Sequence, residues 1–178
     1  MASLILVTGG CRSGKSDFAQ QRAEQLSDRL LFIATCPGTD VEMAERIRLH
    51  QQARCHAGWK NIEEQLSPAK VIRRSEPGMT ILVDCLTLWI SNQLFDAERR
   101  GWQLREHDVD ILAKDMAAAG KEYKGTVIMV TGEVGQGIVP DNALARTYRD
   151  LVGRCNRIVA AAADQVFLVS CGIPLQLK

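Results

Sequence analysis

The sequence predicts an α/β fold built on a mainly parallel β-sheet. Five short apolar runs have the length of buried strands, and they lie at residues 4–8, 30–35, 80–85, 126–131 and 166–170. Each run is continuous rather than alternating, as expected for strands that helices cover on both faces. Helical patterns separate the runs, which favours parallel strands joined by crossover helices. Residues 172–178 are expected to add an antiparallel edge strand.

Length and composition fit one globular domain, which we expect to span residues 1–178. The chain has 22 Lys and Arg against 21 Asp and Glu, and this near balance predicts no general attraction to nucleic acid or to anionic membranes. No apolar segment has the length of a membrane span or the form of a signal peptide. Six widely spread cysteines without zinc-ligand spacing indicate reduced thiols. A cytoplasmic protein is predicted.

A glycine-rich stretch directly after the first apolar run carries the strongest functional signal. It matches the pattern G-x-x-x-x-G-K-[ST] with Gly9, Gly10, Cys11, Arg12, Ser13, Gly14, Lys15 and Ser16. Such a loop presents backbone N–H groups and a helix N-terminus to phosphates. Lys15 is expected to reach the β- and γ-phosphates, and the Ser16 hydroxyl to ligate Mg²⁺. An ordinary glycine-rich turn is the alternative, but the order of strand, loop and helix favours binding of a nucleoside triphosphate.

An acidic residue, Asp84, ends the third apolar run. In proteins with this loop, such an acid lies beside the phosphates and holds Mg²⁺ or its water. Acids at strand ends are common, so the prediction depends on the loop at Gly9. We predict Asp84 to be a second Mg²⁺ ligand.

Residues 40–54 are predicted to form a helix on which Arg46, His50 and Arg54 recur every four residues. Two guanidiniums suit phosphate groups, and their charge favours the neutral imidazole between them. A neutral imidazole nitrogen is a competent nucleophile toward phosphorus. The alternative is a surface histidine between solvated arginines, and the pattern alone favours this simpler interpretation.

Several other segments have two interpretations each. Residues 67–78 are expected to be the most mobile part of the surface, and residues 92–121 to be largely helical. The aromatic residues Trp89, Phe95 and Trp102 either complete the core, which is favoured, or line a pocket for a bulky substrate. Residues 131–140 contain three glycines after a strand, which suits a ligand-facing loop or a flexible connection.

A long helix with an apolar stripe is predicted after Asp141 or Asn142, either of which would cap it. Four arginines lie mostly off that stripe, and we interpret them as a solvated face: Arg146, Arg149, Arg154 and Arg157.

In combination these segments resemble one P-loop family. The resemblance is carried by Ile5–Gly10, Arg12–Ser16, Ile33–Thr35, Glu42–Ala44 with Arg46, Ile47 and His50, Glu133–Pro140, Ala145–Asn156 and Ala162–Asp164. Together they resemble, from end to end, the bifunctional adenosylcobinamide kinase/adenosylcobinamide-phosphate guanylyltransferase of cobalamin biosynthesis. The phosphate loop is generic, whereas the glycine loop ending at Pro140 and the arginine block are specific.

The resemblance implies a RecA-like fold, a homotrimer and two reactions. Such an enzyme phosphorylates the aminopropanol hydroxyl of adenosylcobinamide with ATP or GTP. It then transfers GMP from GTP to adenosylcobinamide phosphate, which gives adenosylcobinamide-GDP and pyrophosphate. His50 matches the family's histidine that carries GMP, and this match reverses the interpretation from pattern alone. Arg46 and Arg54 would then stabilise charge on the α-phosphate.

Lys15 and Asp84 join His50 as predicted catalytic residues. The nucleotide contacts that the resemblance implies are Gly9–Ser16, Thr35, Cys36, Gln51, Gln52, Ala53, Arg54, Glu63 and Asp84. Most relatives lack a cysteine at Cys11, where the loop mainly offers backbone. The alternatives are a small-molecule or nucleoside kinase, a guanylyltransferase without kinase activity, and a non-enzymatic triphosphate-dependent switch. No Asn-Lys-x-Asp segment supports the switch.

Overall fold

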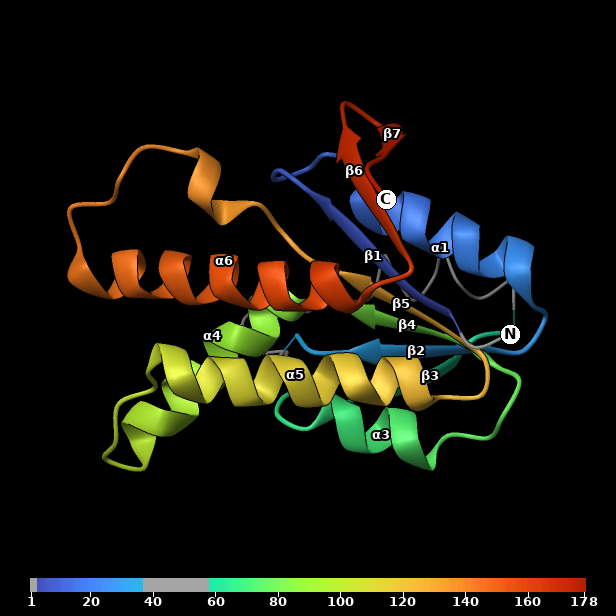
Figure 1. The fold of residues 1–178 in the computed structure, drawn as a ribbon, viewed down its shortest axis with the longest axis horizontal. Coiled ribbons are helices and arrows are strands. Elements are labelled where there is room, and N and C mark those ends of the chain that lie inside the picture. The colour runs from blue at the N-terminus through green and yellow to red at the C-terminus, as the bar shows by residue number, and fades with distance from the viewer. Residues whose placement is uncertain (1–2, 37–57) are drawn as a thin grey trace.

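The computed structural model describes residues 3–36 and 58–178, which build a seven-stranded sheet between helices (Figure 1). The strands are β1 (Ser3–Gly9), β2 (Leu30–Ala34), β3 (Lys60–Glu63), β4 (Thr80–Asp84), β5 (Thr126–Val130), β6 (Gln165–Ser170) and β7 (Ile173–Gln176). Their order across the sheet is β3-β2-β4-β5-β1-β6-β7. All neighbouring strands are parallel except β6 and β7, so the predicted antiparallel edge is confirmed.

The helices form two layers on opposite faces of the sheet. Their bounds are α1 (Lys15–Leu26), α3 (Pro68–Arg74), α4 (Leu86–Arg99), α5 (Glu106–Glu122) and α6 (Ala143–Ala162), with a short 3₁₀ turn η1 (Val134–Gln136). Helix α1 covers one face, and α3, α4, α5 and α6 cover the other (Figure 1). The strands are buried between these layers, which explains why their sequences are continuous apolar runs.

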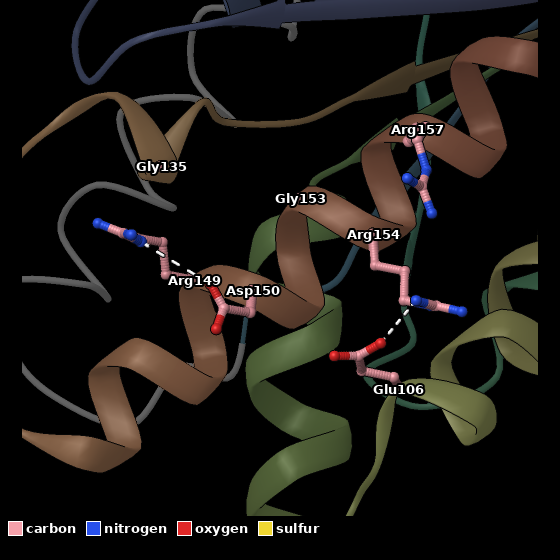
Figure 2. A pocket seen from close by; sticks show the side chains of 7 residues that line it. All are labelled: Glu106, Gly135, Arg149, Asp150, Gly153, Arg154 and Arg157. Atoms are coloured by element: carbon pink, nitrogen blue, oxygen red, sulfur yellow. Dashed lines mark hydrogen bonds and ion pairs between the residues drawn. The ribbon is translucent and has the colours of Figure 1, made fainter. Parts of the chain in front are cut away.

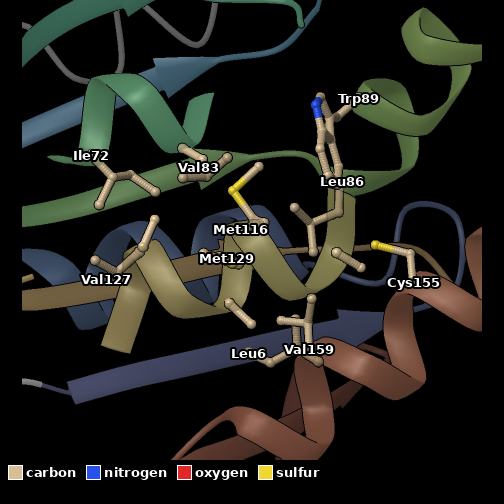
Figure 3. Packing of buried hydrophobic residues seen from close by; sticks show 14 of the residues in the cluster. Leu6, Ile72, Val83, Leu86, Trp89, Met116, Val127, Met129, Cys155 and Val159 are labelled. Atoms are coloured by element: carbon tan, nitrogen blue, oxygen red, sulfur yellow. The ribbon is translucent and has the colours of Figure 1, made fainter. Parts of the chain in front are cut away.

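The larger core lies between the sheet and the four-helix layer. Figure 3 shows Met116 of α5 and Leu86 of α4 packed together with Leu6, while Cys155 and Val159 approach from α6. All five side chains are at most 1% exposed. This layer therefore fixes α6 against the sheet, and the position of α6 decides where its polar side chains point.

Three features differ from the sequence prediction. Strand β3 was not predicted, because its four residues are exposed and carry no apolar run. Residues 67–78, expected to be mobile, contain helix α3, which begins with Pro68 at its first turn and buries Ala69 and Ile72. The helical region at 92–121 is two helices, because the chain turns at Gly101, whose φ is 76°.

Candidate active site

The phosphate loop joins β1 to α1 through backbone conformations that glycine allows. Gly14 has a φ of 87° at the helix start, and Arg12 also has a positive φ, 53°. The Lys15 ammonium donates to the Gly10 carbonyl oxygen at 3.2 Å, so it lies folded over the loop. Both Lys15 and Ser16 are half-buried at the first turn of α1. The loop therefore has the geometry of an anion cradle.

The loop is held from behind by strands β6 and β7. A Cβ atom on Gly9 would meet the Val169 carbonyl oxygen at 2.4 Å, so only glycine fits there. The Gly172 N–H, in the turn between β6 and β7, donates to the Ser13 carbonyl oxygen at 2.8 Å. The buried Ser13 hydroxyl has no hydrogen-bond partner within residues 3–36 and 58–178. These contacts fix the loop's shape before any ligand binds.

Four other predicted nucleotide contacts, Thr35, Cys36, Glu63 and Asp84, lie at the same, carboxyl edge of the sheet. Ala34, the last residue of β2, is paired with Glu63 on one side and with Asp84 on the other. Thr35 follows it and is fully buried, and its hydroxyl both accepts from the Cys85 N–H and donates to the Cys85 carbonyl oxygen. The hydroxyl of Thr35 is thus engaged in joining β2 to β4, and Cys36, next in the chain, is half-buried.

Asp84 is not on the strand next to the loop strand. Strand β5 lies between β1 and β4, and both Val7 and Asp84 are paired with Val130. Two strand spacings separate β1 from β4, or about 10 Å, and four separate β1 from β3, or about 19 Å. Glu63 is therefore the described nucleotide contact farthest from the loop strand.

Asp84 and Lys15 nevertheless act on a common neighbour, the Cys85 thiol. Burial is the main cause that raises the pKa of Cys85 to about 11, and the negative charge of Asp84 adds to it. A hydrogen bond with Thr87 and the positive charge of Lys15 act in the opposite direction. Both charges therefore lie in the neighbourhood of Cys85, at the start of α4.

Two functional positions were missed by the sequence analysis. The Thr8 hydroxyl, at the end of β1, donates to the Glu133 carboxylate at 2.6 Å, and the Glu133 N–H donates to the Gly9 carbonyl oxygen at 3.1 Å. Glu133 therefore ties the turn after β5 to the strand that leads into the phosphate loop. The sequence does show an acidic residue, Glu133, near the start of the glycine-rich stretch. Its hydrogen-bond partners on β1 could not be predicted, because they depend on the order of the strands.

Helix α6 fastens the same turn from the other side. The Asn156 side chain accepts from the buried Thr131 hydroxyl at 2.6 Å and donates to the Gly132 carbonyl oxygen at 3.1 Å. The start of the glycine-rich stretch is thus fixed rather than a flexible connection. Farther along, Ile138 is 95% exposed and Val139 is 57% exposed, so this part of the stretch projects from the surface.

A cationic pocket of about 370 Å³ lies between α6 and η1 (Figure 2). Its lining residues are Glu106, Gly135, Arg149, Asp150, Gly153, Arg154 and Arg157. Arg154 is neutralised by hydrogen-bonded ion pairs with Glu106 and Asp110. Its hydrogen bond to Asp110 holds the pKa of that carboxyl below its usual range. Of the four arginines interpreted as a solvated face, Arg146 and Arg157 are exposed, whereas Arg149 and Arg154 are half-buried and Arg154 is ion-paired. Arg149, Arg154 and Arg157 also line this open pocket.

The aromatic residues take different environments. Trp89 is 2% exposed and belongs to the core, but Phe95 is 58% exposed and Trp102 is 46% exposed, so the core interpretation holds for Trp89 alone. Trp102 lines a cavity of about 580 Å³ together with Leu94, Leu104 and Leu144.

Asn142 caps α6, because its side chain accepts a hydrogen bond from the Ala145 N–H at 3.1 Å. Asn142 is one of the two residues that were predicted as the cap.

The predicted histidine site lies outside the described residues. Arg46, His50, Gln51, Gln52, Ala53 and Arg54 all fall within 37–57. Their places as nucleophile, phosphate-stabilising side chains and nucleotide contacts stay predictions. In the part of the chain that is described, no three His, Cys, Asp or Glu side chains gather as a metal site, and no helix is long and apolar enough to cross a membrane.

Fold and loop together define the class: a three-layer P-loop nucleotide-binding protein of the RecA-like type, with an antiparallel edge strand. Two solved structures share the fold. A protein from Pyrococcus horikoshii OT3 superposes with a TM-score of 0.59 at 8% identity, covering 99% of this chain and 86% of that one. An ATPase from the type III secretion system of pathogenic bacteria gives 0.57 at 11% identity, covering 99% and 57%. At these identities the likeness shows the fold alone.

The family follows from sequence comparison. The model of the family described as cobinamide kinase / cobinamide phosphate guanyltransferase matches residues 5–177. The chain is 40% identical to the bifunctional adenosylcobalamin biosynthesis protein CobU of Salmonella typhimurium (strain LT2), and 38% identical to CobU of Escherichia coli K12, covering 98% of this chain and 99% of each relative. It is 37% identical to CobP of Pseudomonas aeruginosa, covering 97% and 96%. The chain belongs to the cobinamide kinase / cobinamide phosphate guanyltransferase family and is an enzyme of the transferase class.

Proposed function

We propose that this enzyme phosphorylates the aminopropanol hydroxyl of adenosylcobinamide and then transfers GMP from GTP to the product. The observation that carries the proposal is the family match over residues 5–177, with an intact phosphate loop at its start. The relatives named as bifunctional are matched over 99% of their own length.

In the kinase step, the loop would hold the triphosphate through its backbone N–H groups and Lys15. The Ser16 hydroxyl and the Asp84 carboxylate offer the oxygen ligands that Mg²⁺ prefers. No protein cage of carboxylates is needed, because Mg²⁺ at such sites takes its other ligands from phosphates and water. Bound Mg²⁺ would neutralise charge on the β- and γ-phosphates. The fit of Mg²⁺ therefore rests on the chemistry of this hydroxyl and this carboxylate.

In the transfer step, a ring nitrogen of His50 would attack the α-phosphorus of GTP. The bond between the α-phosphorus and the bridging oxygen breaks, pyrophosphate leaves, and a phosphoramidate joins GMP to the imidazole. A phosphate oxygen of adenosylcobinamide phosphate then attacks the same phosphorus, which gives adenosylcobinamide-GDP and restores the histidine. Arg46 and Arg54, spaced by four residues on either side of His50, would stabilise the charge that develops.

The remaining nucleotide contacts are proposed along the carboxyl edge of the sheet. Thr35, Cys36 and Asp84 lie toward its middle, Glu63 lies at its far side, and residues 51–54 would contribute from outside the described residues. This spread suits one extended nucleotide, with phosphates at the loop and guanine toward Glu63. We also propose a homotrimer and a cytoplasmic location.

The proposal is tested by supplying purified enzyme with Mg²⁺, adenosylcobinamide and either ATP or GTP, and separating the corrinoid products. We expect adenosylcobinamide phosphate with either donor, and adenosylcobinamide-GDP only with GTP. EDTA or Lys15→Ala is expected to stop both reactions, because both require a correctly held triphosphate. Phosphorylation of adenosylcobinamide without GMP transfer would indicate a simple kinase. GMP transfer to added adenosylcobinamide phosphate, without phosphorylation of adenosylcobinamide, would indicate a guanylyltransferase without kinase activity.

A further inference from the structure

The pocket between α6 and η1 is lined by a regular arrangement of arginine and glycine residues. Arg149, Gly153 and Arg157 are spaced by four residues, so they lie in one row along α6 (Figure 2). The two arginine Cα atoms are about 12 Å apart along the helix. The Arg149 side chain extends toward η1, away from Gly153, so a change of its rotamer is needed to bring both guanidiniums to one phosphate group (Figure 2).

Gly153 leaves the space between Arg149 and Arg157 on the surface of α6 unfilled. Glycine is among the poorest helix formers, so its place in the middle of α6 calls for a reason. The reason is not close packing, since a Cβ atom there would meet nothing within 4 Å. Any longer side chain at this position would instead fill the space between the two arginines. The facing wall is Gly135 of η1, another residue without a side chain.

Two of the three arginines have charge available for a ligand. The charge of Arg154 is neutralised by its ion pairs with Glu106 and Asp110. Within the described part of the chain, the ion pair of Arg149 is with the neighbouring Asp150 at 4.0 Å, which is too long for a hydrogen bond, and Asp150 is 67% exposed. Among residues 3–36 and 58–178, no hydrogen bond or ion pair engages Arg157. Their guanidiniums are planar forks that match phosphate oxygens.

The pocket is also joined to the phosphate loop by short connections. Gly135 lies two residues after Glu133, which is bonded to Thr8 and Gly9. At the other end, Arg157 follows Asn156, which is bonded to Thr131 and Gly132. An anion in this pocket would therefore be held by the same turn and helix that position the edge of the loop.

We propose that Arg149, Gly153 and Arg157 form the subsite for the phosphate group of the acceptor, the phosphate monoester that receives GMP. This assignment rests on the proposed function. It gives the enzyme two separate phosphate sites, one for the triphosphate at Gly9–Ser16 and one for the acceptor on α6. The subsite would distinguish the phosphorylated acceptor from its unphosphorylated precursor, which lacks the dianion.

Equilibrium dialysis tests the subsite without requiring turnover. The phosphate loop is first saturated with a GTP analogue in which neither the α–β nor the β–γ bridge can be cleaved, so that neither GMP nor the γ-phosphate is transferred. Adenosylcobinamide and its phosphate are then dialysed separately, and each is followed by its colour. Wild-type enzyme is expected to bind the phosphate form at least about tenfold more tightly, as one charge-assisted contact supplies. Arg149→Gln and Arg157→Gln should each reduce this preference about tenfold and leave binding of adenosylcobinamide unchanged.

Two further variants make the result decisive. Gly153→Leu keeps both charges and strengthens the helix, yet it should also abolish the preference by filling the pocket. Arg100→Gln removes one charge from an exposed arginine directly after α4 and should have no effect. A preference retained in the three pocket variants, or weaker binding of the GTP analogue in them, would overturn the assignment. If wild-type enzyme shows the preference but transfers no GMP, the proposed reaction fails and the subsite stands.

Discussion

At the scale of single residues, the site depends on polar side chains that no local pattern identifies. Glu133 bonds Thr8 across 125 positions of sequence, and Asn156 bonds Thr131 across 25. Each pair joins segments that meet only because β5 inserts beside β1 and α6 packs over their ends. The phosphate loop, in contrast, was predictable because its chemistry is contained in eight consecutive residues.

Asn156 offers a direct test of this buried network. Asn156→Ala leaves the Thr131 hydroxyl and the Gly132 carbonyl oxygen without their partner in a buried environment, so we expect the free energy of unfolding to fall by about 2 kcal/mol. Urea unfolding followed by circular dichroism measures the change. Asn61→Ala is the control, because the Asn61 amide is exposed and donates only a 3.3 Å bond to Trp59. Equal stabilities of the two variants would show that the Asn156 bonds contribute little.

At the scale of elements, continuous apolar runs predicted the buried strands well. Five of the seven strands were predicted to within a residue or so, and the C-terminal edge strand was expected in its observed orientation. Strand β3 was missed because an exposed edge strand needs no apolar run. Helix α3 was missed because its short sequence is rich in charged residues and lies among prolines. Its two buried apolar residues, Ala69 and Ile72, are too few to form a recognisable helical pattern.

The phosphate loop provides a matched pair of substitutions at this scale. Gly9→Ala would place a methyl group 2.4 Å from the Val169 carbonyl oxygen, whereas a Cβ atom on Gly10 meets nothing within 4 Å. We expect Gly9→Ala to lower the free energy of unfolding by about 2 kcal/mol or more, and Gly10→Ala to change it little. Thermal unfolding without nucleotide measures both. Similar losses in the two variants would contradict the described packing of the loop against β6.

At the scale of the whole molecule, Asp164 joins distant parts of the chain. Its carboxylate accepts from the Leu4 N–H at 2.8 Å and pairs with Lys121, so it links the start of β1 to the end of α5. The Leu4 hydrogen bond, followed by the Lys121 bond, holds the pKa of Asp164 below its usual range. A carboxylate with a lowered pKa stabilises the fold above the unfolded-state pKa, and this contribution is lost as the pH falls through the folded-state pKa.

Asp164→Asn should therefore destabilise the protein at pH 7 but not in acid. We expect a loss of about 1 kcal/mol at pH 7, because the side chain is 40% exposed and solvent screens its ion pair. The difference from the wild type should narrow as the pH falls below about 4. Urea titrations at pH 7 and at the lowest pH that preserves folding compare the two proteins. A difference that stays constant with pH would show that the charge of Asp164 is not its cause.

The order of the strands also belongs to this scale and was beyond sequence patterns. Asp84 was predicted to lie beside the phosphate loop, yet β5 separates β4 from β1, so Asp84 ends a strand that is two strand spacings from the loop strand. Runs of apolar residues do not encode which strands pair. Family resemblance supplied what periodicity did not: without it, the spacing of Arg46, His50 and Arg54 favours an ordinary surface helix.

We propose that His50 carries GMP between GTP and the acceptor. The most direct measurement is the intact mass of enzyme incubated with Mg²⁺ and GTP alone, followed by mapping of the modified peptide. We predict one added GMP, acid-labile and located on His50, absent from His50→Ala and retained by His56→Ala. An adduct of undiminished yield in His50→Ala would contradict the account.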